Sequence, residues 1–247
     1  MKAWLIAWLA VLIFGVAGCS KSLQERAEQG DPDAQHALGY MYDQGEGVPI
    51  DDAEAAKWYR MAAEQGHAEA QLSLGIMLDE GEGVAIDDAE AVKWYLKAAE
   101  QGIADAQFYL GFMYAIGEGV PANEAESFRW YSLAAEQGNA DAQLEIGAMY
   151  ENGKSVPADA AKAMKWYRKA AEQGNAQAQN NVGVLYVNGE GIPQDYVEGY
   201  AWLAAAGANG CEFSYQTNAE IRPKLSSREL ADARKRAKDL RLKYPSE

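Results

Sequence analysis

Side chains able to perform acid–base, nucleophilic or metal chemistry are few in this sequence and fall into no reactive pattern. The two histidines, His36 and His67, belong to no H-E-x-x-H pattern, and the chain has no cysteine pair at metal-ligand spacing and no G-x-S-x-G turn. Gly-x-Gly segments such as 45–47 lie between predicted helices, whereas a phosphate-binding loop connects a strand to a helix. Acidic pairs near these segments lack the alternating oxygen ligands of a calcium-binding loop. The sequence therefore predicts no catalytic residue, no metal site and no cofactor.

Cys19 is the residue for which the surrounding sequence predicts a covalent modification. An apolar run at residues 3–17 follows the N-terminal lysine; it is short for a membrane span of ~20 residues but typical of a signal peptide. The sequence Val-Ala-Gly-Cys at 16–19 resembles the lipobox of bacterial lipoproteins, in which cleavage exposes an N-terminal cysteine that receives acyl chains. An ordinary secretory signal that contains a cysteine is the alternative.

Lipidation would place this protein on a membrane of the bacterial cell envelope. We expect a signal peptide at 1–18 and an acylated Cys19, and Ser20 is compatible, by the same resemblance, with sorting to the outer membrane, facing the periplasm. Cys211 would then be the one remaining thiol, so no intrachain disulfide is expected. We expect Cys211 to be a small, partly buried residue.

A fixed interval of 36 residues organises the rest of the chain. Several residue types recur at this interval, among them Trp58, Trp94, Trp130, Trp166 and Trp202, and Ala34, Ala70, Ala106, Ala142 and Ala178. Such a period indicates one supersecondary unit stacked on copies of itself. Five units run from residue 31 to residue 210. Because the tryptophans are identical in every copy, we interpret them as packing residues.

Each unit has the pattern of two amphipathic helices joined by a glycine-rich loop. In the first unit, the helical stripes comprise Ala34, Leu38, Met41 and Tyr42, then Ala55, Trp58, Tyr59 and Ala62. Acidic or amide side chains stand where helices need N-caps: Asp31 before Pro32, Asp51 or Asp52, Asp87 or Asp88, Asn139, Asp159 and Asn175. We therefore interpret the carboxylates of this set primarily as helix caps.

The repeat resembles the Sel1-like repeat, a relative of the tetratricopeptide repeat. The matching residues in the third unit are Ala106, Leu110, Gly111, Tyr114, Gly117, Gly119, Val120, Trp130, Tyr131, Ala134, Ala135 and Gly138. Two departures are Ser155, in place of a loop glycine, and Leu203, in place of the tyrosine after Trp202. The resemblance implies an all-α, right-handed superhelical solenoid that acts as an interaction scaffold, and it implies no chemistry by itself.

Short segments at the two ends are predicted to close the solenoid. Residues 19–30 would form the lipidated N-terminus, a short tether and an N-terminal cap, and residues 211–247 would form C-terminal capping helices. Ser226 and Glu229 have the spacing of a capping box.

Charge is strongly unequal along the chain. Removal of the signal peptide takes away one lysine from a net charge of −15 and leaves −16. The last segment, 222–247, carries nine lysine or arginine residues against four acidic ones, so the rest of the mature chain is close to −21. Such a surface repels nucleic acid and favours a basic protein patch or a cationic peptide.

Differences among the copies indicate where a partner binds. By the resemblance, the first helices line the concave side of the solenoid, and their outward positions vary from copy to copy. The predicted partner-binding residues are Tyr40, Phe108, Tyr109, Phe112, Glu145 and Asn181. Aromatic residues in the third unit form the expected anchor. An equal alternative is that Phe108 and Phe112 pack between repeats as core.

Two functional hypotheses follow. The favoured one is a membrane-anchored envelope scaffold or adaptor, not an enzyme, which binds a protein or peptide in the solenoid groove and assembles or regulates an envelope complex; no small-molecule substrate is expected. The alternative is an envelope enzyme or binding protein acting on peptidoglycan or a β-lactam.

Overall fold

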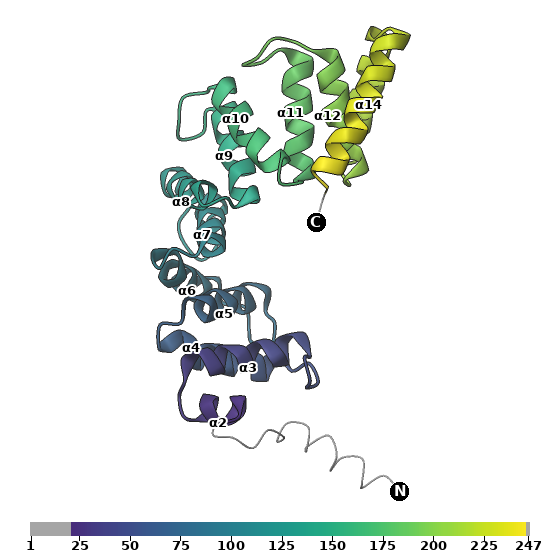
Figure 1. Ribbon diagram of the computed structural model, residues 1–247. Coiled ribbons are helices and arrows are strands. Elements are labelled where there is room, and N and C mark those ends of the chain that lie inside the picture. The colour runs from purple at the N-terminus through teal and green to yellow at the C-terminus, as the bar shows by residue number, and fades with distance from the viewer. Residues whose placement is uncertain (1–20, 246–247) are drawn as a thin grey trace, which may run out of the picture. The chain divides into compact units, whose positions relative to one another are not determined.

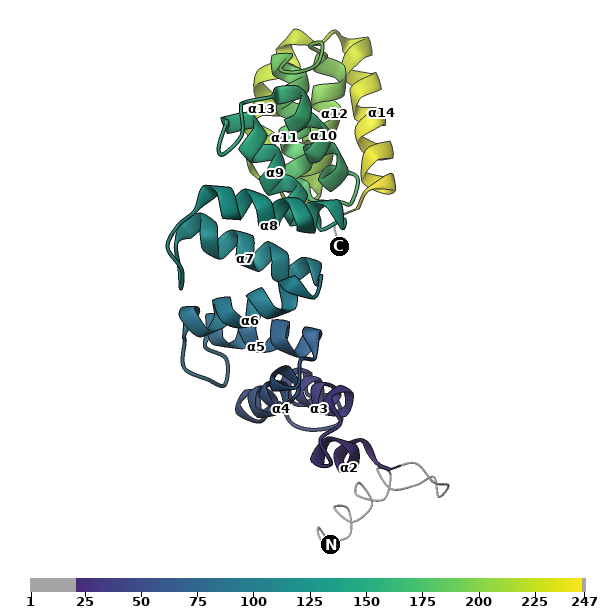
Figure 2. The same cartoon turned by 90° about the vertical axis from the view of Figure 1, so that its left-hand side faces the viewer.

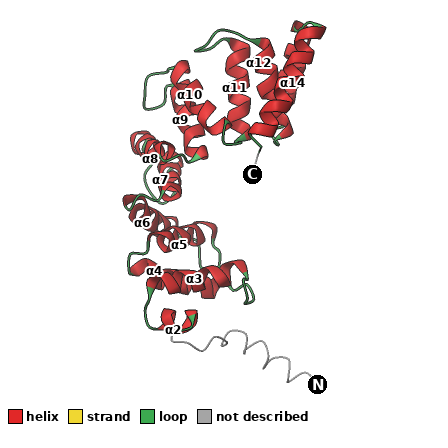
Figure 3. Cartoon of the chain, viewed as in Figure 1, coloured by secondary structure: helices red, strands yellow, loops and turns green. Residues whose placement is uncertain are grey.

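The chain folds into helices and loops throughout the part that can be described. The computed structural model describes residues 21–245, and no strand occurs in that range (Figure 3). The described residues divide into two compact units: unit 1 contains residues 21–103 and 118–120, and unit 2 contains residues 104–117 and 121–245. The predicted signal peptide and Cys19 lie outside the described residues. Between residues 21 and 245, no helix has the length and apolar character needed to cross a membrane.

Each repeat is a pair of helices joined by a loop, which confirms the predicted all-α solenoid of two-helix repeats (Figure 1). The first helices are α3 (Pro32–Gln44), α5 (Ala68–Glu80), α7 (Ala104–Ile116), α9 (Ala140–Asn152) and α11 (Ala176–Asn188). The second helices are α4 (Asp52–Glu64), α6 (Asp88–Glu100), α8 (Glu124–Glu136), α10 (Ala160–Ala171) and α12 (Tyr196–Ala208).

The helices begin at the capping residues that the sequence predicts. Asp51 accepts a hydrogen bond from the Glu54 amide at 3.0 Å, and the equivalent residues Asp87 and Asp159 cap α6 and α10 in the same way. A side-chain oxygen at this position satisfies one of the unpaired N–H groups of the first turn. The loop of the fourth repeat requires a left-handed residue where Ser155 replaces glycine. Ser155 adopts this conformation, with a φ of 59°.

The repeated tryptophans are packing residues, as predicted. Trp94, Trp130 and Trp202 are buried, whereas Trp58 and Trp166 are half-buried against neighbouring core clusters. Their indole nitrogens differ in hydrogen bonding. Nε1 of Trp94 and of Trp202 donates to a glutamate one turn earlier, at 3.2 and 3.1 Å, while Nε1 of Trp58 and of Trp130 is buried with no hydrogen-bond acceptor.

Within each unit, buried glutamines link first helices to the helices that precede them. Gln143 Nε2 donates to the Ala135 carbonyl at 3.1 Å, and Gln143 Oε1 accepts from Gln173 Nε2 at 2.9 Å. The same bonds recur around Gln71 and Gln179. These amides satisfy polar groups that the repeat interface removes from water, so they fix the register between successive repeats.

Both ends of the array carry additional helices. At the start, α2 (Leu23–Glu28) packs on α3. Its Ala27 carbonyl accepts a hydrogen bond from Gln35, as the Ala135 carbonyl accepts one from Gln143 in the interior of the array. At the other end stand α13 (Phe213–Ile221), the short 3-10 helix η1 (Arg222–Lys224) and α14 (Ser227–Lys243).

The last helix is held along α12 by several kinds of contact. Figures 1 and 2 show α14 beside α12. The predicted capping box of Ser226 and Glu229 is present, and Tyr244 stacks on Trp202 with a centroid separation of 6.1 Å. Cys211, which precedes α13, is a free cysteine, as expected, and at 7% exposed it is more buried than the partial burial predicted.

Candidate functional site

Tyrosines of the second helices pass directly over glycines of the first helices. A Cβ atom at Gly147 would lie 2.5 Å from the ring of Tyr167, and the same close approach occurs between Gly111 and Tyr131 at 2.7 Å. Only glycine leaves room for such a contact. The rings thereby reach from the second helix across to the first, and burial raises the pKa of both hydroxyls.

In three repeats the tyrosine hydroxyl donates a hydrogen bond to a carboxylate of the first helix. The hydroxyls of Tyr59, Tyr95 and Tyr167 donate to Asp43, Asp79 and Glu151, at 3.2, 3.3 and 2.6 Å. Each carboxylate thus has a donor. The fifth repeat has Leu203 and Val187 at the two positions, and both are buried in an apolar cluster.

The third repeat breaks this pattern. Ala115 occupies the position of the carboxylate, and the charge that affects Tyr131 is instead that of Glu145, on α9 of the next repeat. Glu145 is half-buried, and burial raises the pKa of its carboxyl group above the usual 4.5. Within the described chain, this carboxylate forms no hydrogen bond and no ion pair. Tyr131 itself is only 2% exposed, so we give the name Glu145 surface to the accessible residues Phe112, Ala115 and Glu145.

Phe108 and Phe112, whose roles the sequence left open between partner binding and core packing, differ in burial. Phe108 is half-buried, its ring centroid lies 5.7 Å from that of Tyr131, and it packs against the core cluster that α8 of its own repeat forms with α9 of the next. Phe112, one turn later on α7, is 43% exposed. Phe108 is therefore a residue of the inter-repeat core, and Phe112 is available to a partner. Tyr109 lies edge-on to Phe108 at 5.6 Å.

The other predicted partner-binding residues lie in both units. Glu145 and Asn181 belong to α9 and α11 of unit 2, and both affect the hydroxyl of Tyr167, from α10. Asn181 Oδ1 also accepts from Gln177 at 3.2 Å. Tyr40, 45% exposed, is on α3 in unit 1. Unit 2 thus holds five of the six predicted residues on α7, α9 and α11.

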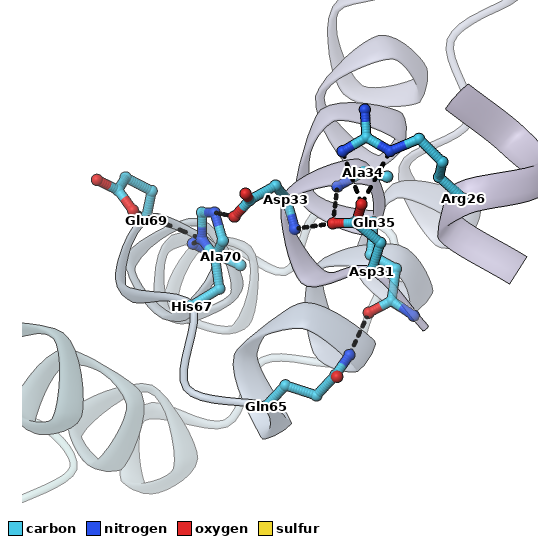
Figure 4. A network of polar contacts seen from close by, with 9 residues as sticks. All are labelled: Arg26, Asp31, Asp33, Ala34, Gln35, Gln65, His67, Glu69 and Ala70. Carbon is cyan, nitrogen blue, oxygen red and sulfur yellow. Dashed lines mark hydrogen bonds and ion pairs between the residues drawn. The ribbon is translucent and has the colours of Figure 1, made fainter. Parts of the chain in front are cut away.

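The two histidines, which share no sequence motif, lie against each other in the fold. Their rings stack with a centroid separation of 4.6 Å, and His67 also caps α5 by accepting from the Ala70 amide at Nδ1. Figure 4 shows His67 between Asp33 and Glu69, each 3.5 Å from one of its nitrogens. Burial and the neighbouring histidine lower the pKa of His36. Among the described residues, no group of histidine, cysteine and acidic side chains is arranged to hold a metal ion.

The first helices differ from the second helices in charge. None of the five first helices contains a lysine or an arginine, whereas their acidic residues are Asp33, Asp43, Glu69, Asp79, Glu80, Asp105, Asp141, Glu145 and Glu151. The second helices α4, α6, α8 and α10 carry basic residues, and several of these form ion pairs or lie over tryptophan rings. In unit 2 the first helices therefore carry the exposed Phe112 together with acidic side chains. These helices contain no lysine or arginine that could neutralise the carboxylates.

The repeats match a known family. The family model for the Sel1 repeat matches five consecutive segments, residues 32–67, 68–103, 104–139, 140–175 and 176–211. No curated protein matches the chain in sequence.

Solved structures of Sel1 repeat proteins are also similar to this chain. A Sel1 repeat protein from Oxalobacter formigenes is 38% identical over 78% of this chain and 79% of that one, with a TM-score of 0.73. A Sel1 repeat protein from Klebsiella pneumoniae subsp. pneumoniae, 23% identical over 81% of this chain and 97% of that one, has a TM-score of 0.50 and shares the fold. A protective antigen of uropathogenic Escherichia coli strains that displays an SLR fold is 30% identical over 90% of this chain and 63% of that one, with a TM-score of 0.44.

Sel1 repeat proteins generally serve as scaffolds that bind protein partners, and the fold is typically not catalytic. With five matched repeats and an extensive similarity to the Oxalobacter structure, the chain belongs to the Sel1 repeat family.

Proposed function

We propose that this protein is a lipid-anchored adaptor of the bacterial cell envelope that binds a protein or peptide partner on the Glu145 surface and so assembles or regulates an envelope complex. The observation that carries the binding part is the exposed Phe112 on an acidic helix layer, next to the break in the tyrosine–carboxylate pattern. Exposed aromatic residues bordered by polar groups are typical anchors of protein interfaces, since burying them on binding removes a large apolar area from water.

Substitution of Phe112 by alanine is expected to weaken partner binding by about 1–3 kcal/mol, because the exposed ring would lose its contacts in the complex. The partner would first be identified by covalent cross-linking in the native envelope and mass spectrometry. Affinities of the parent and Phe112→Ala proteins for the purified partner would then be compared by calorimetry.

The matched control is Leu133→Ala on α8, because Leu133 is a similarly exposed apolar residue of the same repeat, at 37%, on a second helix. We expect Leu133→Ala to bind like the parent. Equal affinities of all three proteins, at unchanged melting temperature, would remove the Glu145 surface from the proposal. Phe108 is unsuitable for this test because its substitution would also disturb the inter-repeat core.

The envelope location in this proposal is supported by the sequence before the described residues. The small residues before Cys19 and the apolar run upstream fit lipoprotein processing, and α2 begins at Leu23, which leaves only a short tether after the acylated cysteine. Several acyl chains would bind a membrane far more firmly than one, which alone is marginal. An anchor this close to α2 would keep the repeats near the membrane surface.

Cys19→Ala is expected to abolish lipid attachment, because the thiol is the acylated group. Cells expressing either protein would be fed a labelled fatty acid, and the label on each purified chain would be measured after fractionation. The parent protein should carry the label and stay with the outer membrane, and the variant should carry none. Label retained on Cys19→Ala would disprove the anchor, and parent label confined to the inner membrane would correct its location.

A further inference from the structure

We infer that the Glu145 surface binds a lysine or arginine side chain, so that the partner contributes a basic peptide segment. This inference rests on the proposed function and specifies the chemistry of the partner. It is drawn from three features of unit 2: a half-buried carboxylate without a donor, an exposed aromatic ring on α7, and first helices without basic residues.

The state of Glu145 is the first argument. Asp43, Asp79 and Glu151 each accept a hydrogen bond from a tyrosine, but Glu145 is half-buried and has no such donor. Partial removal of a charged carboxylate from water is unfavourable unless a cation or a donor compensates it. A bound ammonium or guanidinium group would supply both the charge and the hydrogen bonds.

The surroundings of Glu145 suit a long basic side chain. Tyr131 packs on Gly111 of α7 and extends toward Glu145 of α9, and Phe112 lies one residue after that glycine. Ala115, which is exposed, occupies the position at which three other repeats have a carboxylate. A basic peptide segment can cover the exposed Phe112 ring with its aliphatic side-chain carbons and place a charged end on the Glu145 carboxylate, whereas Tyr131, at 2% exposed, is already covered.

Charge complementarity selects a basic segment over a neutral or acidic one. The first helices of unit 2 contain four acidic residues, Asp105, Asp141, Glu145 and Glu151, and no lysine or arginine. Such a layer attracts cations and repels acidic chains over about one Debye length, ~10 Å at 0.1 M salt. This electrostatic attraction speeds the encounter and favours basic partners, and Phe112 adds contacts that depend little on salt.

Proton release follows from the environment of Glu145. The charged groups that affect it are Asp141 on the same helix, which raises its pKa, and Lys154 in the following loop, which lowers it; the hydroxyls of Tyr131 and Tyr167 face it from α8 and α10. Because burial raises the Glu145 pKa, this carboxyl group keeps its proton to a higher pH than an ordinary glutamate does. A cation favours the ionised form, so binding should release a proton and strengthen as pH rises.

The test uses the full-length protein in detergent micelles and short fluorescent peptides of alternating lysine and glycine, or glutamate and glycine. Dissociation constants would be measured by fluorescence anisotropy for the parent, Glu145→Gln and Glu136→Gln. Glu136 is an exposed glutamate on α8, so its substitution makes the same change in net charge on a second helix. Measurements at about pH 5.5 and 7.5 keep carboxyl groups of ordinary pKa ionised at both values.

We expect the lysine peptide to bind the parent and the glutamate peptide not to bind. Glu145→Gln should weaken lysine-peptide binding about tenfold at pH 7.5, Glu136→Gln less than about twofold, and only proteins that retain Glu145 should bind more tightly at pH 7.5 than at pH 5.5.

Three results would overturn the inference: no binding of the lysine peptide, equal weakening by the two glutamine variants, or a pH dependence that persists in Glu145→Gln. Because glutamine has the shape of glutamate, a folded variant is expected, and its melting temperature would be checked first. If the natural partner loses affinity for Phe112→Ala but binds Glu145→Gln like the parent, the proposed function stands and the basic-segment inference fails.

Discussion

Trp130→Ala is expected to lower the free energy of unfolding by about 3–5 kcal/mol, because the substitution removes a large side chain from a core that cannot fully collapse around the space left. Trp130 is only 4% exposed, and the Arg129 guanidinium group lies 4.5 Å from the centre of its ring. Urea denaturation would give the free energy, and hydrogen exchange would show where protection is lost. Helices α7, α8 and α9 should lose protection first, since repeats contact their neighbours.

The matched control for this prediction is Trp166→Ala, at the same repeat position in α10. Trp166 is half-buried rather than buried, so its loss should cost clearly less than the loss of Trp130. Equal costs for the two substitutions, or unchanged hydrogen exchange in α7–α9 of Trp130→Ala, would contradict the packing role assigned to Trp130.

Gln143→Glu is expected to destabilise the array by about 3–5 kcal/mol at neutral pH, although the two side chains have almost the same shape. Gln143 is 4% exposed and donates to the Ala135 carbonyl; an ionised glutamate there would place an oxygen against that carbonyl with no donor between them. A protonated glutamate keeps a donor, so the folded state raises the pKa of the new carboxyl group.

The pH dependence of Gln143→Glu has a definite sign. Because the folded-state pKa lies above the unfolded one, the variant should approach the parent's stability at acidic pH and lose stability as pH rises through the raised pKa. Gln173→Glu is the control, because Gln173 belongs to the same hydrogen-bonded pair but is exposed. Melting curves from pH 4 to 8 that are parallel for Gln143→Glu and the parent would contradict the structural role of the buried glutamines.

The repeat pattern predicted the fold because its signals are local and recur in every copy. The spacing of Trp58 and its equivalents fixed the unit, and caps such as Asp51 fixed where the helices begin. Gln143 and its equivalents recur at the same interval, but a polar residue on a helix usually faces water, and only the contact between repeats shows why these are buried.

The candidate site was less predictable because it depends on contacts between different repeats. Both Phe108 and Phe112 follow a helical apolar pattern, and the packing against Tyr131 decides which of them is covered. The change at Ala115 is visible in the sequence as a difference among copies, yet its meaning requires knowing that a tyrosine hydroxyl reaches this position in the other repeats. Likewise, His36 and His67 stand at unequal repeat positions, and only the fold stacks them.

The central claim, that a protein partner binds the first-helix side of unit 2, is tested most directly by site-specific photo-cross-linking in living cells. A photoreactive phenylalanine analogue would replace either Phe112 or Leu133 in the full-length, processed protein, and irradiated cells would be examined for covalent adducts. Both positions are exposed, so both analogues can react with whatever lies against them. The account predicts a defined protein adduct from position 112 and none from position 133, whereas adducts from position 133 alone, or the same adducts from both positions, would contradict it.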